Sequence, residues 1–254
     1  MLQVVIIGSG NVAQHLIKAF GTIAQAQLVQ AFARHPDQLA TLLPPEKITN
    51  SLNNLAEADV YIIAVKDDAI TDVSSQLPFK GKLVVHTSGS MDLGQIDNKN
   101  RRGVFYPLQT FSKNKTVDFT TVPLCLESEF EENYAVLELL AKALSNSVYR
   151  ISSEQRQSLH VAAVFASNFS NHMYALSSQI CQQNNIPFGI LNPLIEETAG
   201  KIKSLSPVKA QTGPAVRNDR KTIQKHLDFL TDENQKAIYK LLTQSIQQTN
   251  EQEL

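Results

Sequence analysis

The sequence predicts an α/β N-terminal domain with a doubly wound parallel sheet, followed by an all-α C-terminal domain with one long helix. In residues 1–151, short apolar runs rich in β-branched residues alternate with segments of helical periodicity, which is typical of a parallel sheet covered by helices on both faces. From Ser152 onward the strand pattern stops, and residues 152–183 contain neither glycine nor proline. We therefore predict two domains, 1–151 and 152–254.

The predicted strands all lie in the first domain. The run VVII that ends at residue 7 indicates a parallel strand buried on both faces, because it is apolar at every position. Strands are predicted at 3–7, 28–33, 59–65 and 82–86, with short ones near 47–49, 103–106, 122–126 and 147–151. Helices are predicted between them at 11–20, 36–43 and 67–76. This alternation predicts right-handed crossovers.

The second domain is predicted to be helical. Ser-Ser-Glu at 152–154 is a typical N-cap sequence, and one helix over 153–184 would be about 48 Å long. Such a rod is longer than a small domain is wide, so we expect it to pack against a partner domain or subunit as well as its own. Helices at 190–204 and 219–248 are predicted to flank the loop SPVKAQTGPAVRND.

Composition favours a globular protein that acts on a small molecule. The chain has 254 residues, 43% hydrophobic and 19% charged, with a formal net charge of -1, which argues against a nucleic-acid or membrane-surface partner. Cys125 and Cys181 lack metal-ligand spacing and are too few for a disulfide framework, so we expect no metal site and a reducing compartment. With no basic leader and no apolar run of about 18 residues, we expect a cytoplasmic protein.

A glycine-rich turn follows the first strand. Gly8, Gly10 and Ala13 fit the pattern G-x-G-x-x-G/A, in which the first glycine permits the tight turn and the second lets the backbone approach a pyrophosphate. The helix N-terminus adds free N–H groups and a positive dipole for the phosphates. The residues predicted to bind a dinucleotide here are Gly8, Ser9, Gly10, Asn11, Val12 and Ala13. The alternative is a tight turn with a structural role alone.

The end of the second strand indicates which dinucleotide binds. An NAD site has an Asp or Glu about 20 residues after the glycines, where it accepts a hydrogen bond from the ribose 2′-hydroxyl. The sequence has Arg34 and His35 there, and the planar guanidinium of Arg34 suits a 2′-phosphate, which favours NADP. The alternative is that Arg34 is a solvated loop residue and Asp37 contacts the ribose of NAD.

Two later strands end in the polar turns KDDAI and TSGS. The carboxyl ends of parallel strands meet at the edge where open α/β sheets bind ligands. We therefore expect Val65, Lys66 and Thr87 to contact the cofactor, and Thr87 and Ser88 to line the substrate space. The alternative for Lys66 and the two aspartates after it is a helix start, whose dipole the acidic residues suit.

The motifs GSGNVA, AVKDDAI, HTSGS, YPLQTFS and TGPAVRND, with a helix that carries His and Asn eight residues apart, resemble the DUF2520 family over nearly the whole chain. That family consists of predicted NADP-dependent oxidoreductases related to pyrroline-5-carboxylate reductase and to the β-hydroxyacid and 6-phosphogluconate dehydrogenases. The resemblance implies an NADP-binding Rossmann domain, a helical domain similar to the C-terminal domain of 6-phosphogluconate dehydrogenase, and a homodimer formed through the helices. It implies no particular substrate.

The chain departs from the β-hydroxyacid dehydrogenases at one position. In their pattern a lysine and an asparagine lie four residues apart on the long helix, as acid/base and substrate anchor. Asn168 fits the second position, whereas Val164 occupies the first. The mechanism must therefore use a different proton donor, or the chain has no catalytic activity.

His160 is the predicted proton donor, because reduction of a carbonyl or imine leaves charge that an acid neutralises. It lies two helical turns before Asn168, so both side chains are expected on one stripe, with His160 as general acid and Asn168 as orienting donor. The alternative is a core histidine that satisfies a hydrogen bond among apolar neighbours. His172, one turn beyond Asn168, is a weaker candidate.

Three residues from two other motifs complete the predicted substrate site. Arg217 suits a bidentate contact with a carboxylate, although an interdomain salt bridge explains it equally well, and Asp219 beside it is expected to cap the last helix. Tyr106 and Gln109 lie at a strand end, on a loop that the sheet positions. The alternative is that Tyr106 is a buried aromatic residue with a satisfied hydroxyl.

Together these features predict an NADP(H)-dependent oxidoreductase that reduces a small carbonyl or imine compound bearing a carboxylate, in a cleft between the domains. Val164 motivates one alternative, a protein that binds or senses NADP(H) without turnover. A second alternative is that the glycine turn binds another adenosine-containing ligand, such as S-adenosylmethionine or FAD.

Overall fold

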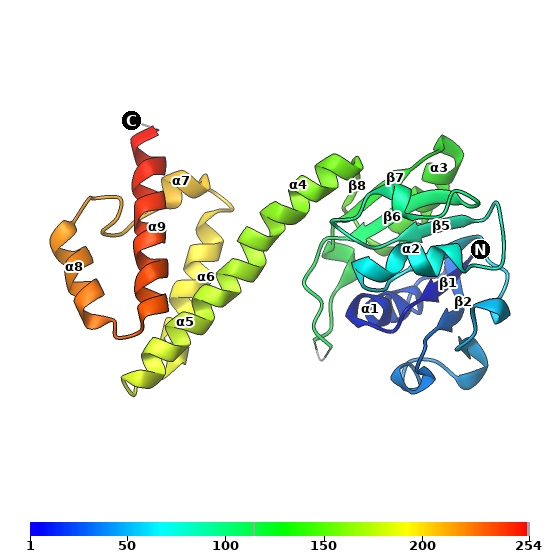
Figure 1. The fold of residues 1–254 in the computed structure, drawn as a ribbon, viewed down its shortest axis with the longest axis horizontal. Coiled ribbons are helices and arrows are strands. Elements are labelled where there is room, and N and C mark those ends of the chain that lie inside the picture. The colour runs from blue at the N-terminus through cyan, green and yellow to red at the C-terminus, as the bar shows by residue number, and fades with distance from the viewer. Residues whose placement is uncertain (114, 253–254) are drawn as a thin grey trace. The chain divides into compact units, whose positions relative to one another are not determined.

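The computed structural model of the chain describes residues 1–113 and 115–252. Contacts within the chain divide it into two compact units, Met1–Ser167 and Asn168–Leu254. The first unit holds an open sheet with helices packed on it, and the described part of the second is helical (Figure 1). The predicted fold class, an α/β sheet domain followed by an all-α region, is confirmed.

The described strands form one eight-stranded sheet. They are β1 (Leu2–Ile7), β2 (Ala26–Phe32), β3 (Ile48–Thr49), β4 (Val60–Ile63), β5 (Leu83–His86), β6 (Arg101–Pro107), β7 (Leu124–Ser128) and β8 (Val148–Arg150). All eight lie at or beside predicted positions. Their order is β3-β2-β1-β4-β5-β6-β7-β8, and neighbouring strands are parallel except β6 and β7. The carboxyl ends of β1, β2, β4, β5 and β6 therefore share one edge. Strands β2 and β3 are added on one side of β1 and strands β4, β5 and β6 on the other, so the strand order reverses between β1 and β4.

Burial on both faces explains the apolar strand sequences. The helices of this unit are α1 (Asn11–Phe20), α2 (Ile70–Ser75), α3 (Glu131–Leu144) and α4 (Ser153–Ala163). Val4 and Ile6 of β1 pack in the apolar layer that contains α1 and α3, whereas Val5 and Ile7 pack in the layer that contains Ile70 of α2. Because side chains alternate across a strand, an unbroken apolar run requires cover on both faces.

Two segments of the first unit differ from the sequence prediction. The helix predicted over 36–43 is wrong: only a 3-10 turn, Pro36–Gln38, forms there. So short a segment between prolines closes too few i+4 hydrogen bonds to offset helix nucleation. Conversely, α3 was not predicted, although Leu137, Leu140 and Leu144 recur at helical spacing and are buried.

The long predicted helix is present, with an irregular segment inside it. Ser152 caps α4 in a reciprocal capping box with Gln155. After α4 the hydrogen bonding becomes π-helical over Val164–Phe169 and then returns to α-helical in α5 (Ser170–Gln183). The sequence pattern did not indicate this π segment, which contains both Val164 and Asn168. Such segments are rare and occur frequently at functional sites.

The rest of the second unit is a series of shorter helices. They are α6 (Asn192–Lys201), α7 (Pro207–Ala210), α8 (Arg220–Phe229) and α9 (Glu233–Gln252). Asp219 caps α8 by accepting from the Thr222 N–H at 3.1 Å, which confirms the predicted cap. The single helix predicted over 219–248 is wrong, because the Asp232 carboxylate accepts from the Gln235 N–H at 2.8 Å and starts a new helix.

The two compact units divide later in the chain than the boundary predicted at residue 151. The reason lies in the first turn of α4, where Ser153 and Arg156 are buried. Both side chains form hydrogen bonds to Glu127 of β7. The start of the long helix therefore belongs to the sheet unit.

Replacing Gly8 should destabilise the fold, whereas replacing Gly10 should not. Gly8 has a φ of +140°, and a Cβ there would lie 2.1 Å from the Ala64 carbonyl oxygen; a Cβ on Gly10 would meet no atom within 4 Å. We expect Gly8→Ala to lower the free energy of unfolding by about 2 kcal/mol or more, and Gly10→Ala to change it by less than about 1 kcal/mol. Urea titrations of the two variants measure this difference. Equal effects would contradict the close approach of Gly8 to Ala64.

Candidate functional site

The glycine turn after β1 leaves the N-terminus of α1 open. Gly10 is the N-cap residue, and in the described part of the chain no side-chain hydrogen bond caps this helix. Gly8 brings the turn against the backbone of Ala64 at the end of β4, while a Cβ on Gly10 would meet no atom of the described residues within 4 Å. Free N–H groups at a helix start with room above them form an anion site. These residues therefore fit the pyrophosphate of a dinucleotide.

The side chains of the turn bind neighbouring loops. Ser9 Oγ donates to Gln38 Oε1 at 2.6 Å, and Asn11 Nδ2 donates to the Phe111 carbonyl at 2.9 Å. Val12 is half-buried and Ala13 is buried in the core beneath the helix. Of the residues predicted to bind a cofactor here, Ser9 and Asn11 thus offer their backbone N–H groups rather than their side chains.

Arg34 and His35 follow β2 on the same edge of the sheet. The Gly8 N–H donates to the Phe32 carbonyl at 2.9 Å, which holds the end of β2 beside the glycine turn. Both side chains are exposed, and no ion pair to Arg34 is found among the described residues. Asp37 is also exposed, in the 3-10 turn that follows. Arg34 thus follows, as an exposed residue, two positions after the strand end that contacts the glycine turn.

The turns after β4 and β5 are joined to each other. The Thr87 N–H donates to the Ile63 carbonyl at 3.2 Å, and Ser90 Oγ donates to the Asp67 carboxylate. Val65 lies beside Gly8, and Lys66 is exposed. The structure therefore brings the predicted cofactor residues of these turns together with the glycine turn.

Ser88 and His86 hold the second of these turns in shape. Ser88 Oγ accepts from the N–H groups of Ser90 and Met91, both at 3.1 Å. The buried ring of His86 accepts from the Ser88 N–H at Nδ1 (3.2 Å) and donates from Nε2 to the Asp92 carbonyl (3.3 Å). Burial, followed by the positive charge of Arg156, lowers the pKa of His86 to about 4. The neutral ring therefore spans the turn at neutral pH.

Tyr106 and His160 form a hydrogen-bonded pair above this turn. Tyr106 Oη lies 3.1 Å from His160 Nδ1, and a Cβ on Gly89 would lie 2.5 Å from that nitrogen. Burial raises the pKa of Tyr106 to about 12, so its hydroxyl keeps its proton and is able to donate to Nδ1. With Tyr106 as the donor, the ring of His160 has its exchangeable proton on Nε2. The half-buried histidine is thus held on the polar edge of the sheet.

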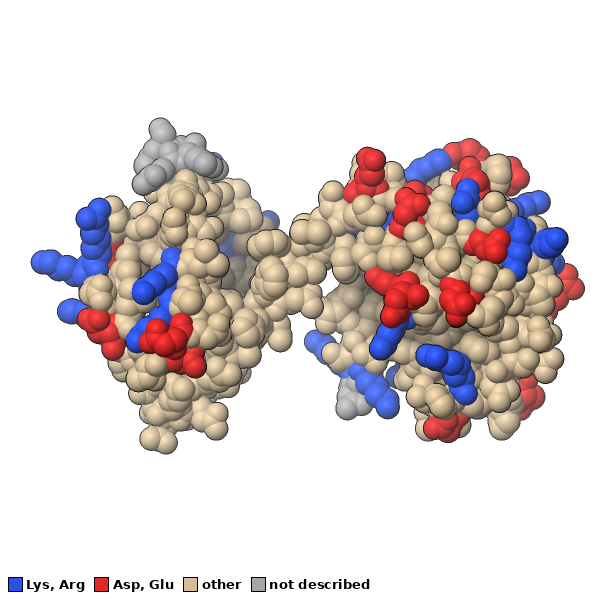
Figure 2. All heavy atoms as spheres, in the orientation of Figure 1, with Lys and Arg blue, Asp and Glu red and all other residues tan. Residues whose placement is uncertain are grey.

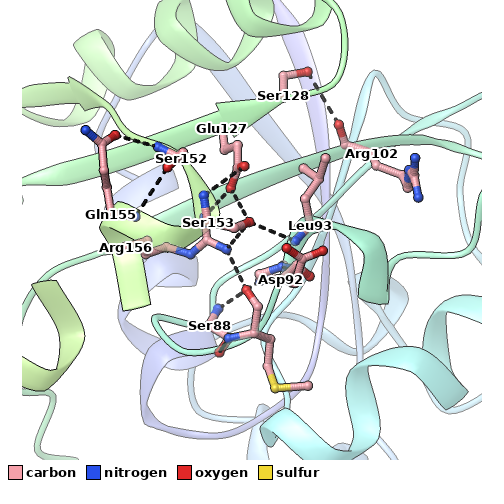
Figure 3. A network of polar contacts seen from close by, with 12 residues as sticks. Ser88, Asp92, Leu93, Arg102, Glu127, Ser128, Ser152, Ser153, Gln155 and Arg156 are labelled. Carbon is pink, nitrogen blue, oxygen red and sulfur yellow. Dashed lines mark hydrogen bonds and ion pairs between the residues drawn. The ribbon is translucent and has the colours of Figure 1, made fainter. Parts of the chain in front are cut away.

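Arg156, one turn before His160, was not among the residues predicted for the site. Arg156 is fully buried and pairs with the Glu127 carboxylate (Figure 3). Its Nη2 donates to the Met91 carbonyl and to Ser153 Oγ. The single signal in the sequence was its spacing of four residues from His160, which puts both side chains on one face of α4. A charged residue near a helix start is otherwise typical of a solvated surface.

The other predicted substrate residues are divided between the two units. Gln109 is exposed after β6, and its Oε1 accepts from the adjacent Thr110 N–H at 2.8 Å. Asn168 and Arg217 belong to the second unit, and both are exposed there. Arg217 precedes Asn218, which has a φ of +50°. In the described residues no three His, Cys, Asp or Glu side chains gather to hold a metal ion.

Comparisons with known proteins fit this geometry. Residues 3–89 match a family described as coenzyme F420-dependent NADP oxidoreductase, and residues 122–246 match DUF2520, a domain of unknown function. A Bacteroides fragilis protein assigned as an NADP oxidoreductase is 38% identical, with a TM-score of 0.85, over 97% of this chain and 98% of its own. The chain belongs to the DUF2520 family. It is thus part of an NAD(P)-dependent oxidoreductase family.

More distant structures share the fold of this DUF2520 chain. A reductive aminase from Aspergillus terreus, in complex with NADPH and ethyl levulinate, has a TM-score of 0.68 at 13% identity over 98% of this chain and 94% of its own. A 1-pyrroline-5-carboxylate reductase from Streptococcus pyogenes has a TM-score of 0.66 at 15% identity over 98% of both chains. No curated protein matches the sequence. In the described part of the chain, no helix has both the length and the apolar character needed to span a membrane.

His86 should make the stability of the DUF2520 chain depend on pH between about 6.5 and 4. In this window the ordinary histidine of the unfolded chain binds a proton, whereas buried His86 does not until about pH 4. Acidification therefore favours unfolding, by about 3 kcal/mol in total at about 1.4 kcal/mol per pKa unit. In His86→Gln the loss of stability between pH 7 and 4 should be smaller by this amount, which urea titrations at both pH values measure. An identical pH dependence would contradict the buried neutral ring.

Proposed function

We propose that this DUF2520 protein is an NADP(H)-dependent reductase that acts on a small carbonyl or imine compound bearing a carboxylate. One observation carries the proposal: an open dinucleotide turn and a Tyr106–His160 proton-donor pair lie on the same carboxyl edge of the sheet. The oxidoreductase family and its fold relatives among reductases of C=N bonds support the reaction class. The free, buried cysteines Cys125 and Cys181 support a cytoplasmic location.

Arg34 supports NADP over NAD as the cofactor. Its exposed guanidinium follows β2 beside the glycine turn, at the position where an NAD site has a carboxylate. A guanidinium pairs with a phosphate through two parallel hydrogen bonds, and His35 next to it adds a further donor. Gly8 to Ala13 would hold the pyrophosphate on backbone N–H groups, with Val65, Lys66 and Thr87 flanking the dinucleotide.

The proton comes from His160 in this proposal. Bound NADPH supplies the hydride, and the substrate atom that gains electron density requires a proton. Tyr106 donates to Nδ1, so the proton on Nε2 of His160 is the one available for transfer. Thr87 and Ser88 would line the substrate space, and Asn168, Arg217 and Gln109 remain predicted as orienting donor, carboxylate clamp and substrate contact.

Val164 favours a second candidate function, a protein that binds or senses NADP(H) without turnover. It occupies the half-buried position on the π segment where related dehydrogenases have the catalytic lysine. Both candidate functions require NADP(H) binding, so only a measured turnover rate distinguishes them. In the sensor, variants of His160 would leave cofactor binding unchanged and there would be no turnover to lose.

We also propose that a second copy of the chain covers the helical unit. Ten of the sixteen large hydrophobic side chains that are exposed among the described residues lie in this unit, between Phe169 and Leu242. Ile190, Leu194 and Leu241 are each more than 60% exposed. On the face shown in Figure 2, uncharged residues cover most of this unit, while both signs of charge are interspersed over the sheet unit. Exposed apolar patches of this kind mark interaction surfaces.

The cofactor proposal predicts tighter binding of NADPH than of NADH. Arg34→Ala should raise the Kd for NADPH about tenfold to a hundredfold and leave that for NADH unchanged, because a charge-assisted pair is lost. Gly10→Asp should abolish binding of both by placing a carboxylate at the pyrophosphate site. Fluorescence titration measures these constants, with Arg101→Ala at the opposite end of β6 as control. An unchanged preference in Arg34→Ala would refute the role of Arg34.

The catalytic proposal predicts separate losses in rate and in cofactor binding. His160→Gln should lower kcat for imine or keto-acid reduction about 10²- to 10⁴-fold, and Tyr106→Phe about tenfold, with the Kd for NADPH unchanged in both. His172→Gln, on the exposed face of α5, is the matched control and should retain full activity. Steady-state assays over a panel of small keto acids and cyclic imines measure kcat. Full activity of His160→Gln would exclude it as the donor.

The dimer proposal predicts a solution mass twice that of the chain. Leu194→Glu should shift the protein toward monomer and weaken association at least about tenfold, because a charge would then lie in the apolar surface. Leu139→Glu, an equally exposed leucine on α3 of the sheet unit, should leave the mass unchanged. Sedimentation equilibrium measures both variants. A monomeric wild-type protein would refute the proposal.

A further inference from the structure

The first two turns of α4 have few apolar contacts with the sheet. Glu154, Gln155, Gln157 and Ser158 are exposed, and of the residues from 153 to 158 only Ser153 and Arg156 are buried. Apolar burial therefore does little to fix the orientation of this part of the helix on the sheet or its distance from the sheet. The proposed proton donor, His160, follows on the next turn.

Polar contacts replace that apolar cover. Glu127 of β7 accepts from both the N–H (2.9 Å) and the Oγ (2.8 Å) of Ser153, and it pairs with Arg156. Ser153 Oγ accepts in turn from the Leu93 N–H at 3.1 Å, and Arg156 donates to the Met91 carbonyl. Figure 3 shows the guanidinium pointing from α4 into this group, between the strand and the loop after β5. One side chain thus joins a helix, a strand and a loop.

This arrangement is poorly explained by stability alone. A buried ion pair gains little net free energy, because the desolvation of both charges offsets their attraction. Arg156 Nε is buried and has no hydrogen-bond partner among the residues that the structure describes, which adds a further cost in free energy. Buried polar groups of this kind serve best to select one geometry over its neighbours.

The geometry selected is that of His160. His160 Nδ1 lies 3.1 Å from Tyr106 Oη. A Cβ on Gly89 would be only 2.5 Å from the same nitrogen. A small shift of α4 toward the loop would press the ring into Gly89, and a small shift away would break the contact with Tyr106. Met91, which Arg156 holds, is two residues from Gly89 in the same loop. Arg156 therefore holds both α4, which carries His160, and the loop that carries Gly89.

We propose that Arg156 is a positioning residue, which uses its buried pairing with Glu127 and the Met91 carbonyl to hold His160 against Gly89 and Tyr106. The proposal rests on the proposed reductase function for its effect on rate. It does not rest on that function for its effect on the histidine ring. In this proposal Tyr106 donates to Nδ1, so that the proton of His160 lies on Nε2.

The test uses the full chain and two readouts. Long-range ¹H–¹⁵N correlation of the histidine rings, assigned with His160→Gln, reports the tautomer of His160 without any substrate. In Arg156→Met we expect this signal to change from the single Nε2–H tautomer to an average of both, and kcat to fall at least tenfold while the KM for NADPH changes less than threefold. Arg156→Lys should show the same direction, because an ammonium cannot bridge Glu127 and Met91 in the fork geometry of a guanidinium.

The controls separate positioning from folding. Arg150→Met removes a comparable but exposed pair with Glu131 at the end of the same sheet and should leave both readouts unchanged. If Arg156→Met does not fold, Glu127→Gln, which keeps the shape and one acceptor oxygen, should shift the His160 signal in the same direction. A folded Arg156 or Glu127 variant with the wild-type His160 signal and kcat would overturn the proposal. If the wild-type protein shows no turnover, the reductase proposal is refuted. A shifted His160 signal in the Arg156 or Glu127 variant would then still support the positioning role.

Discussion

The central constraint on this protein is that its inner strands are buried on both faces. β1 and β4 carry apolar side chains at nearly every position, and helices cover them from both sides. The interiors of these two strands are apolar, so the groups able to contact a ligand lie at the strand ends. Because β1, β2, β4, β5 and β6 are parallel, five such ends share one edge. The candidate site follows from this arrangement.

Polar groups that do lie inside the sheet unit are used to shape the edge. His86 remains neutral through burial and the nearby charge of Arg156, and it spans the turn on which Gly89 lies. Arg156 in turn joins α4 to that turn and to Glu127. The charge of Arg156 and the neutral state of His86 are compatible, because the cation disfavours a second positive charge on the ring. Together they join the turn after β5 to a helix start that has few apolar contacts, and we propose that this unit supports His160.

The glycine turn could be predicted from the sequence, whereas the contacts around His160 could not. Gly8, Gly10 and Ala13 form a local motif, so their spacing sufficed to predict the open start of α1. The pairing of Tyr106 with His160 joins residues 54 positions apart and could be expected only as two separate candidates. Arg156 was missed because its burial depends on Glu127 and Met91, which are distant in sequence. Helix α3 was missed although its pattern was present, and the 219–248 helix was predicted too long because Asp232 acts as a cap within it.

The sequence by itself determined the alternation of strands and helices, the fold class and the glycine turn before α1, because these depend on local periodicity and local motifs. Only the tertiary structure decided that Tyr106 contacts His160, that Ser88 holds a turn, and that Arg156 is buried. Each of these depends on which groups exclude water from one another across the sheet. Desolvation and hydrogen-bond pairing are properties of the assembled fold, and a linear sequence does not state them.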